Sequence, residues 1–374
     1  MPGLLPNVDP DGLLEFSVVY TDRSVNHMST KFQGAMREIS RILKAVYNGN
    51  SAAIVPGSGT FGMEAIARQF AADKRCLIVR NGLFSFRWSQ ILETGAISGH
   101  VTVLKAKRVS EASESPFAPI PIQEAAQTIL AEKSEIVFLP HVETSSGMIL
   151  PDAYIASLAE AVHSVSGLLV LDCVASGALW IDMDKLGVDI LVTAPQKGWS
   201  GPPCCAMVVL SALARKRIEA TASSSFSCDL KKWLEIMEIY EKGAHAYHAT
   251  PPTDSLVALM KVMQEMEVFG FEKARAAQAE LGRRARLLLG AKGFKSVAAP
   301  GFEAPGVVVC YTSDPEIQSG KKFKDLGVQI ASGVPLKIDE PADYRSFRLG
   351  LFGLDKLKDV DGTLARLSRI LDRL

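Results

Sequence analysis

The sequence predicts an α/β protein built on a mostly parallel sheet, and three observations carry that prediction. Short apolar runs that lack polar residues recur through the first two hundred or so residues. Each run ends at a turn and is followed by a helical pattern, which is typical of a parallel sheet covered by helices on both faces. The length of 374 residues exceeds one ordinary domain, so we expect a second, smaller domain.

The alternation of strand and helix can be followed from residue 30 onward. Strands are expected at 52–55, 76–79, 101–104, 136–139, 168–171, 190–192 and 206–210, the last of them returning along the sheet. Helices are expected where apolar side chains recur at helical spacing, at 30–47, 63–70, 85–94, 121–131 and 152–164.

The pattern changes after about residue 255. A long helical region is expected there, followed by short strands and a closing helix, at 255–290, 306–311, 331–333, 347–349 and 356–373. The predicted organisation is therefore an N-terminal arm at 1–15, a large domain at 16–254 and a smaller α+β domain at 255–374.

Composition and charge narrow the class of protein. Hydrophobic residues make up 48% and charged residues 22%, as in a soluble globular chain. The 41 basic and 41 acidic residues form no basic stripe, which argues against nucleic acid or an anionic membrane as a partner. The six cysteines form no CxxC pair, and neither a leader-like opening nor a long apolar span is evident. We therefore expect a reduced, cytoplasmic protein.

The first strand is followed by a loop that suits an anion. Gly57, Ser58, Gly59 and Thr60 stand between the strand at 52–55 and a helix. Glycines let the backbone approach an anion closely, and a helix N-terminus supplies free N–H groups and the positive end of a dipole. Alone the loop is a weak signal, because Ser58 or Thr60 can equally cap the helix.

Two further strands end in ionisable residues. Asp172 closes the strand at 168–171, where a carboxylate either faces a cationic ligand nitrogen or caps the next turn. Lys197 follows the strand at 190–192, where partial burial would make its amine a nucleophile, although an exposed loop lysine is the commoner case. In a parallel sheet such ends meet at one edge. Together the three ends match the phosphate, ring nitrogen and aldehyde of pyridoxal 5′-phosphate.

The chain resembles the class V aminotransferases of pyridoxal-phosphate (PLP) fold type I, near the alanine–glyoxylate and serine–pyruvate aminotransferases. The matching stretches follow the family order: PGSGTFGMEA (56–65), NGLFSFR (81–87), HVETSSG (141–147), LLVLDCVAS (168–176), PQKGWSGPP (195–203), AYHATPP (246–252) and FRLGLFG (347–353). The resemblance implies a three-layer domain with a mostly parallel sheet, a smaller C-terminal α+β domain, and pyridoxal 5′-phosphate as cofactor. It also implies a homodimer with shared active sites.

The resemblance implies a role for each matching position. Around the phosphate it places Ser58, Gly59, Thr60 and Gln196 from one subunit, and Tyr247 and Thr250 from the other. Phe84 and Val174 would lie on the two faces of the pyridine ring, and Thr144 would bond on the side of the ring hydroxyl. Asp172 would keep the ring nitrogen protonated, and Lys197 would form the Schiff base.

The substrate is expected to be held by one arginine. Arg348 would clamp the α-carboxylate, with Arg345 as the runner-up. The implied reaction moves an amino group from alanine or serine to glyoxylate or pyruvate. The sequence departs from the family at both edges of the pocket, because residues 14–23 replace a Gly-Pro-rich segment and residues 335–345 form a longer one.

Two alternatives stay open on the same fold. A 2-aminoethylphosphonate–pyruvate aminotransferase would need extra cations for the phosphonate, for which Arg23 and Arg345 are candidates. A lyase or desulfurase is less favoured, because Gln196 rather than a histidine precedes Lys197. Cys173 is expected to be a buried small residue. The histidines show no spacing that predicts a metal site.

Overall fold

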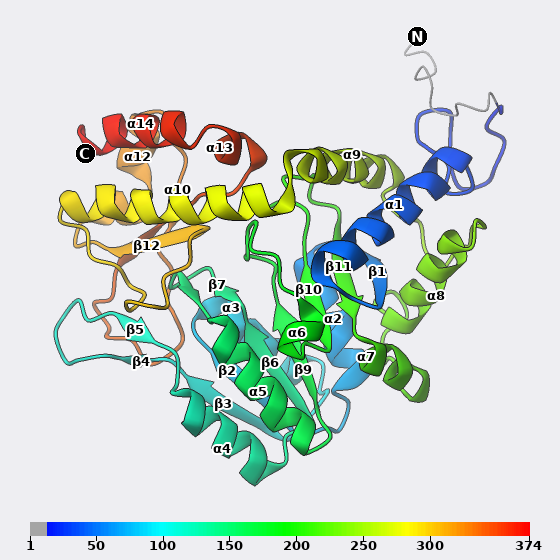
Figure 1. The fold of residues 1–374 in the computed structure, drawn as a ribbon, viewed down its shortest axis with the longest axis horizontal. Helices are drawn as coiled ribbons and strands as arrows, with labels where there is room; N and C mark the ends of the chain where they lie inside the picture. The colour runs from blue at the N-terminus through cyan, green and yellow to red at the C-terminus, as the bar shows by residue number, and fades with distance from the viewer. Residues whose placement is uncertain (1–12) are drawn as a thin grey trace.

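A seven-stranded sheet forms the centre of the computed structural model, which describes residues 13–374 (Figure 1). In spatial order its strands are β1 (Ser51–Pro56), β11 (Cys205–Leu210), β10 (Ile190–Thr193), β9 (Leu168–Asp172), β6 (Ile136–Pro140), β2 (Cys76–Arg80) and β3 (Val101–Lys105). The strand β11 runs in the opposite direction to the other six strands of this sheet. The predicted fold class, with a mostly parallel sheet, is confirmed.

Helices cover both faces of the large sheet. One face packs against α1 (Thr30–Tyr47), α4 (Ile122–Glu132) and α5 (Asp152–Ser164), and the other against α2 (Gly59–Phe70) and α3 (Leu83–Thr94). Successive strand residues therefore enter opposite cores: Leu169 and Leu171 face α5, whereas Val170 faces the side of α2 and α3. This explains why the strands are apolar throughout. The helix α8 (Leu230–Glu241) flanks β1 at the sheet edge (Figure 1).

Short elements fill the connections of this part. They are β4 (Lys107–Arg108), β5 (Phe117–Ala118), β7 (Val142–Glu143), β8 (Met148–Ile149), α6 (Met183–Leu186), α7 (Ala212–Arg217) and a 3₁₀ turn at Ile218–Ala220.

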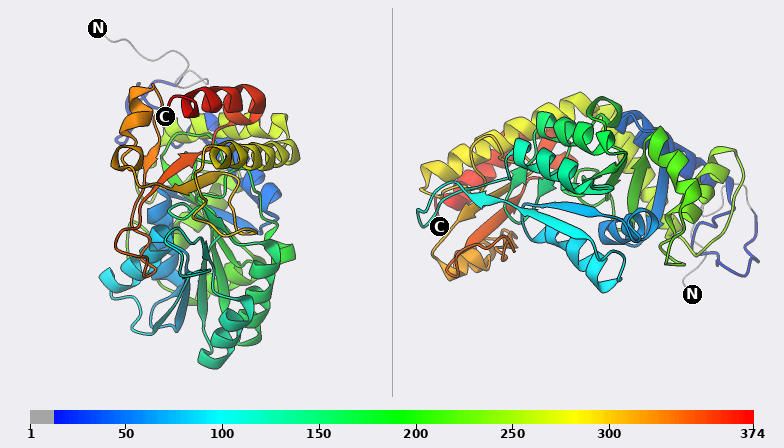
Figure 2. Two further views of the ribbon diagram at one scale, coloured as in Figure 1. Left: turned by 90° about the vertical axis from the view of Figure 1, so that its left-hand side faces the viewer. Right: turned by 90° about the horizontal axis from the view of Figure 1, so that it is seen from below.

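A second, three-stranded antiparallel sheet lies at the end of the molecule opposite α8 (Figure 2). Its order is β12 (Val307–Tyr311), β14 (Ser346–Gly350), β13 (Ala331–Ser332). Val308 and Cys310 point to the core under α10 (Phe271–Ala291) and α14 (Val360–Leu371), while Val307 and Val309 pack with Met148 of β8. The small sheet is thus fixed against the large part on one face. The remaining helices are α9 (Thr253–Phe269), α11 (Pro315–Gln318), α12 (Lys321–Asp325) and α13 (Leu354–Lys358).

Three helix predictions differ from the structure. The expected helical region at 255–290 is two helices, because Gly270 adopts a φ of 98° between α9 and α10. The closing helix is divided at Asp359, whose carboxylate accepts from the Gly362 N–H and starts α14. No helix was expected at α8. The predicted arm lies mostly outside the described residues, and the boundary between the two domains stays a prediction.

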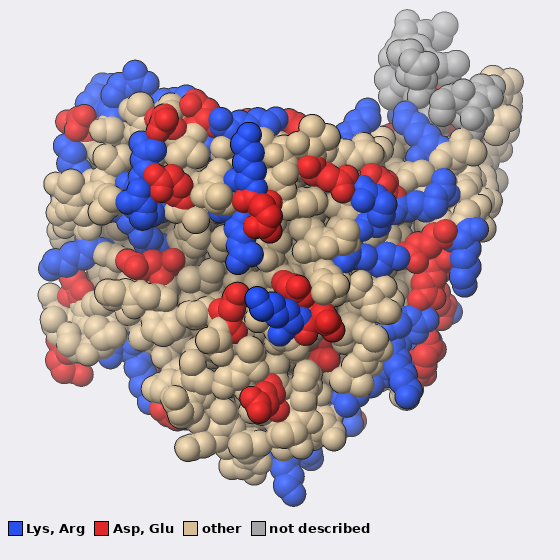
Figure 3. Space-filling view, viewed as in Figure 1, with Lys and Arg blue, Asp and Glu red and all other residues tan. Residues whose placement is uncertain are grey.

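The surface carries mixed charge. Lys and Arg alternate with Asp and Glu over the face drawn in Figure 3, as the equal numbers of the two signs lead one to expect. All six cysteines are buried and unpaired. None of the helices within residues 13–374 is long and apolar enough to cross a membrane.

Candidate active site

The carboxyl ends of five strands meet at one edge of the large sheet. β1, β2, β6, β9 and β10 run in the same direction, so the loops that follow them lie side by side. Residues from all five loops are among those that the sequence predicts for a cofactor. In open α/β sheets this edge is where ligands bind.

Asp172 occupies the end of the central strand β9. It is 8% exposed, its Oδ1 accepts a hydrogen bond of 3.0 Å from the Val174 N–H, and its carbonyl oxygen accepts one of 2.9 Å from the His141 N–H. Burial raises the pKa of Asp172 to about 6, and the nearby Lys197 ammonium opposes that rise. A buried carboxylate whose second oxygen accepts no hydrogen bond within residues 13–374 suits a cationic ring nitrogen.

Lys197 lies in the loop after β10, next to Asp172. A Cβ on Gly198 would lie 2.1 Å from the carbonyl oxygen of Gly177, so only glycine lets this loop approach the turn after β9. The Nζ of Lys197 lies 5.8 Å from the ring centre of Phe84 and 5.9 Å from that of Phe352. Burial between these rings lowers the pKa of Lys197. A lysine in this state is a usable amine nucleophile.

Three cations surround the ring of Phe84. Besides Lys197, the guanidinium carbons of Arg87 and Arg348 lie 5.2 Å and 5.6 Å from its centre. Arg348 comes from β14 of the small sheet, where its Nε donates to the carbonyl oxygen of Ser332 at 2.9 Å. The small sheet therefore places Arg348, the residue predicted to bind the substrate carboxylate, at the edge of the large sheet.

Glu143 fixes the position of Phe84. Its fully buried carboxylate accepts from the N–H groups of Phe84 at 3.1 Å, Ser85 at 2.8 Å and Ser145 at 3.0 Å. A negative charge is stabilised there because Phe84 and Ser85 form the N-terminus of α3. A Cβ on Gly82 would lie 2.1 Å from the Ser145 hydroxyl oxygen, so glycine is needed for this approach.

The loop after β1 keeps its donors available. Ser58 stands at the N-cap of α2 but makes no side-chain capping bond, so it is not the ordinary cap that the sequence allowed. Thr60 accepts a 3.0 Å hydrogen bond from Arg87 Nη1. A Cβ on Gly59 would lie 2.8 Å from the Val174 side chain, so only glycine fits at this position. We call the backbone and side-chain donors of Ser58, Gly59 and Thr60 the cradle. The first N–H groups of a helix lack intrahelical acceptors and suit a phosphate.

The other predicted residues are more exposed than Asp172. Thr144 is partly exposed, and Gln196 is exposed. Tyr247 and Thr250 bond to each other at 2.8 Å on the surface, where Tyr247 is 51% exposed. Arg345 is exposed and lines a separate cavity, and it is not one of the three cations found over the Phe84 ring within residues 13–374.

The divergent N-terminal segment packs against the loop that carries Tyr247. The Tyr20 hydroxyl donates to the Pro251 carbonyl oxygen at 3.4 Å, and the Val25 N–H donates to Asp254 Oδ1 at 3.1 Å. The rings of His27 and Tyr247 lie 5.4 Å apart. In its own chain this segment therefore supports a surface loop and does not enter the group around Phe84.

Three residues of the site were missed as functional residues by sequence reasoning. Arg87, Glu143 and Phe352 all stand inside stretches that carry the family resemblance, NGLFSFR, HVETSSG and FRLGLFG. Their position in those stretches was the available signal. Cys173 is buried, and burial raises the pKa of its thiol, as expected of a packing residue.

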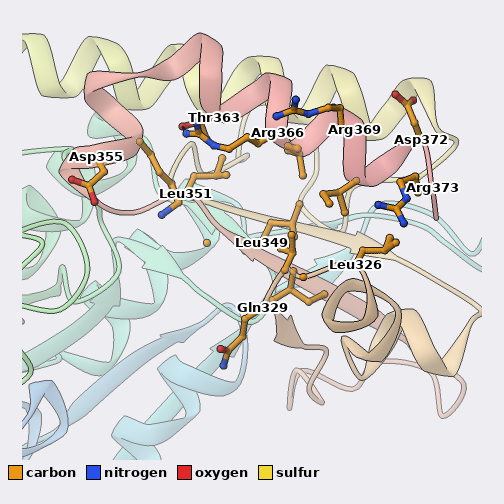
Figure 4. Close-up of a pocket in the computed structure, with 17 residues that line it drawn as sticks. Leu326, Gln329, Leu349, Leu351, Asp355, Thr363, Arg366, Arg369, Asp372 and Arg373 are labelled. Carbon is orange, nitrogen blue, oxygen red and sulfur yellow. Dashed lines mark hydrogen bonds between the residues drawn. The ribbon is translucent and has the colours of Figure 1, made fainter.

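A cavity of about 860 Å³ lies elsewhere, between α14 and the end of β14 (Figure 4). Leu326, Leu349 and Leu351 line it with Arg366 of α14 and with Arg373, which follows that helix. None of the residues predicted to hold cofactor or substrate lines this cavity. No cluster of three or more His, Cys, Asp or Glu within the described part of the chain is arranged to hold a metal.

The fold and the site together define a pyridoxal-phosphate enzyme of fold type I. A cradle at a helix N-terminus, a buried carboxylate and a desolvated lysine meet at one sheet edge, and they fit the phosphate, ring nitrogen and aldehyde of that cofactor. The model of the aminotransferase class-V family matches residues 14–314, and the chain belongs to that family. It is therefore a pyridoxal-phosphate-dependent transaminase.

Several aminotransferases are similar to this chain in sequence or in structure. Alanine–glyoxylate aminotransferase 1 of Saccharomyces cerevisiae is 26% identical over 353 residues, covering 89% of this chain and 88% of the relative. 2-Aminoethylphosphonate–pyruvate transaminase 2 of Paraburkholderia xenovorans is 27% identical and covers 89% and 86%. The crystal structure of an alanine–glyoxylate aminotransferase from Nostoc sp. superimposes with a TM-score of 0.78 at 21% identity, over 93% and 89% of the two chains. That structural likeness concerns the fold.

Proposed function

We propose that this chain transfers an amino group from alanine or serine to glyoxylate or pyruvate. The observation that carries the proposal is the position of Arg348, whose guanidinium lies against the same ring of Phe84 as the amine of Lys197. A substrate whose α-carboxylate is held there presents its Cα close to the amine. A small side chain needs no second charged partner. The relatives named for alanine, glyoxylate and pyruvate support this choice.

Lys197 is assigned the covalent and proton-transfer roles. Bound at this edge, pyridoxal phosphate supplies an aldehyde for the amine and an electron-withdrawing ring for chemistry at the substrate Cα. The lowered pKa of Lys197, caused by burial, increases the share of neutral amine that can act as a nucleophile. The same amine would serve as the group that holds and moves a proton at the substrate Cα.

The neighbouring residues are assigned to hold the cofactor. Asp172, ionised above pH 6, pairs with the protonated ring nitrogen. Phe84 and Val174 restrain the two faces of the ring, and Thr144 bonds beside its hydroxyl. The phosphate is held by the cradle and its neighbour: Ser58, Gly59, Thr60 and Gln196.

The enzyme is further proposed to act as a cytoplasmic homodimer with shared sites. Tyr247 and Thr250 present their hydroxyls at the surface, and these hydroxyls are assigned to the phosphate of a second subunit. Large apolar side chains are exposed in the segments nearby: Leu13, Leu14, Phe16, Val18 and Phe226. Exposed apolar groups of this kind are typical of an interface. Six unpaired buried cysteines suit a reducing compartment.

The alternative amino donor is 2-aminoethylphosphonate, and the name of the relative from Paraburkholderia supports this alternative. The test compares kcat/KM for alanine, serine, aspartate and 2-aminoethylphosphonate, with glyoxylate or pyruvate as acceptor. We expect the small amino acids to be preferred. A wild-type preference for the phosphonate overturns the substrate while leaving the family intact.

Variants sharpen this test. Lys197→Ala should abolish turnover and the covalent trapping of cofactor by borohydride. Arg348→Ala should lower kcat/KM for alanine about 10- to 100-fold, as expected for losing hydrogen bonds to a charged group. Arg345→Ala is the matched control, because Arg345 is exposed and lines a separate cavity. An equal or larger loss in Arg345→Ala contradicts the assignment of the clamp.

A further inference from the structure

We propose that Arg87 supplies the positive charge for the phosphate of the cofactor and acts through the hydroxyl of Thr60. Arg87 Nη1 donates to Thr60 Oγ1 at 3.0 Å, and within residues 13–374 the guanidinium makes no other hydrogen bond. The inference rests on the proposed placement of the phosphate at Ser58, Gly59 and Thr60. Arg87 would thus be a positioning residue in addition to those assigned above.

Charge balance gives the first argument. A phosphate monoester carries a charge of about −1.5 to −2 at neutral pH. The residues assigned to it are uncharged: Ser58, Gly59, Thr60, Gln196 and, from the second subunit, Tyr247 and Thr250. Arg87 is a cation that contacts this set, through the hydroxyl of Thr60. No carboxylate of the described residues forms an ion pair with Arg87, so its charge is available to an anion.

Hydrogen-bond direction gives the second argument. A threonine hydroxyl has one O–H donor and two acceptor lone pairs. Because Arg87 occupies a lone pair of Thr60, the O–H remains free to donate, and the adjacent cation polarises it. Thr60 stands in the first turn of α2, where backbone N–H groups also point at the cradle. The hydroxyl, the backbone donors and the charge thus converge on one place.

The position of Arg87 in the site gives the third argument. Its guanidinium packs on the ring of Phe84, on which Arg348 and Lys197 also lie, so the side chain is held and is not a free surface arginine. Phe84 is itself fixed by Glu143. Arg348 has the carboxylate of the substrate as its partner. The phosphate is the second anion of the reaction and is left for Arg87.

The experiment compares two forms of the cofactor. The full-length chain is loaded with pyridoxal phosphate or with pyridoxal, which lacks the phosphate, and each dissociation constant is measured by absorbance titration. Arg87→Ala should weaken pyridoxal phosphate about 10- to 100-fold and leave pyridoxal unchanged. Arg87→Lys should recover part of the loss, because it restores the charge without the planar fork. Arg68→Ala is the matched control, since Arg68 lies on α2 and pairs with Glu64.

A second comparison tests the route through Thr60. In a Thr60→Val background, Arg87→Ala should cost little further affinity for pyridoxal phosphate, because the bridging hydroxyl is already lost. Full additivity overturns the route. The role of Arg87 is overturned if Arg87→Ala loses equal affinity for pyridoxal phosphate and pyridoxal, or loses no affinity for either. It is also overturned if Arg87→Ala raises KM for aspartate, whose second carboxylate an arginine could bind, and leaves the cofactor affinity unchanged. Failure of the wild-type chain to bind either form overturns the proposed function instead.

Discussion

Replacing Asp172 by asparagine should stabilise the cofactor-free chain and disable the enzyme. The carboxylate is buried at the end of β9, and its pKa is raised from 3.8 to about 6, mainly by burial. A raised carboxylate pKa means that the folded chain holds a proton which the unfolded chain has already lost. The free energy of unfolding of the wild type therefore falls as pH rises from about 4 to about 6.

The size of this effect follows from the shift. Each pKa unit corresponds to about 1.4 kcal/mol, so the rise from 3.8 to about 6 costs the wild type about 3 kcal/mol once the group is ionised. The side-chain amide of the Asp172→Asn variant is neutral at every pH and keeps an oxygen that accepts from the Val174 N–H. The stability of the variant relative to wild type should therefore increase across this window and stay constant above it.

Urea unfolding of both proteins without cofactor, from pH 4 to pH 8, measures the difference. The fluorescence of the four tryptophans, all of them buried, is a suitable probe. With cofactor bound, the same substitution should lower kcat on the order of 100-fold, because the ring nitrogen loses a preorganised charge partner. Parallel pH curves for the two proteins would refute the reasoning. A variant less stable than wild type at pH 8 would show that Asp172 is a structural cap.

Two further predictions concern the dimer and the Lys197 loop. Mixing Lys197→Ala protein with a Tyr247→Phe/Thr250→Val variant should restore activity through hybrid dimers with one intact site, and exchange of subunits without any recovery contradicts a shared site. Gly198→Ala should strongly destabilise the protein, because its Cβ would lie 2.1 Å from a backbone oxygen. Gly34→Ala in α1, with open space around it, should be neutral or stabilising in the same thermal melt.

The sequence predicted the sheet and its loops because their causes are local. A strand buried on both faces must be apolar at every position, so the runs at 136–139 and 168–171 can be read directly. The direction of such strands then places Ser58, Asp172 and Lys197 at one edge without any knowledge of packing. The α/β class and the principal site residues follow from these two facts.

What was missed depends on contacts between distant residues. Arg87 and Thr60 are 27 positions apart, and Glu143 lies 58 positions from Ser85, whose N–H it accepts. No local pattern announces either contact. The helix α8 is a different case, because its buried residues Leu230, Trp233, Leu234, Met237 and Tyr240 recur at helical spacing, so a local pattern was present and was overlooked.

The balance of charge at the site links binding to reactivity. Burial, together with the charges of Arg348 and Arg87, lowers the pKa of Lys197, whereas Asp172 raises it. A carboxylate bound at Arg348 would cancel the repulsion from that side, and a phosphate near Arg87 would do the same from the other. Each anion that enters therefore makes the lysine amine a stronger base. Under the proposed function, the amine assigned to take a proton from the substrate would thus gain basicity when the substrate is in place, and in the free chain it would be readier to react with an aldehyde.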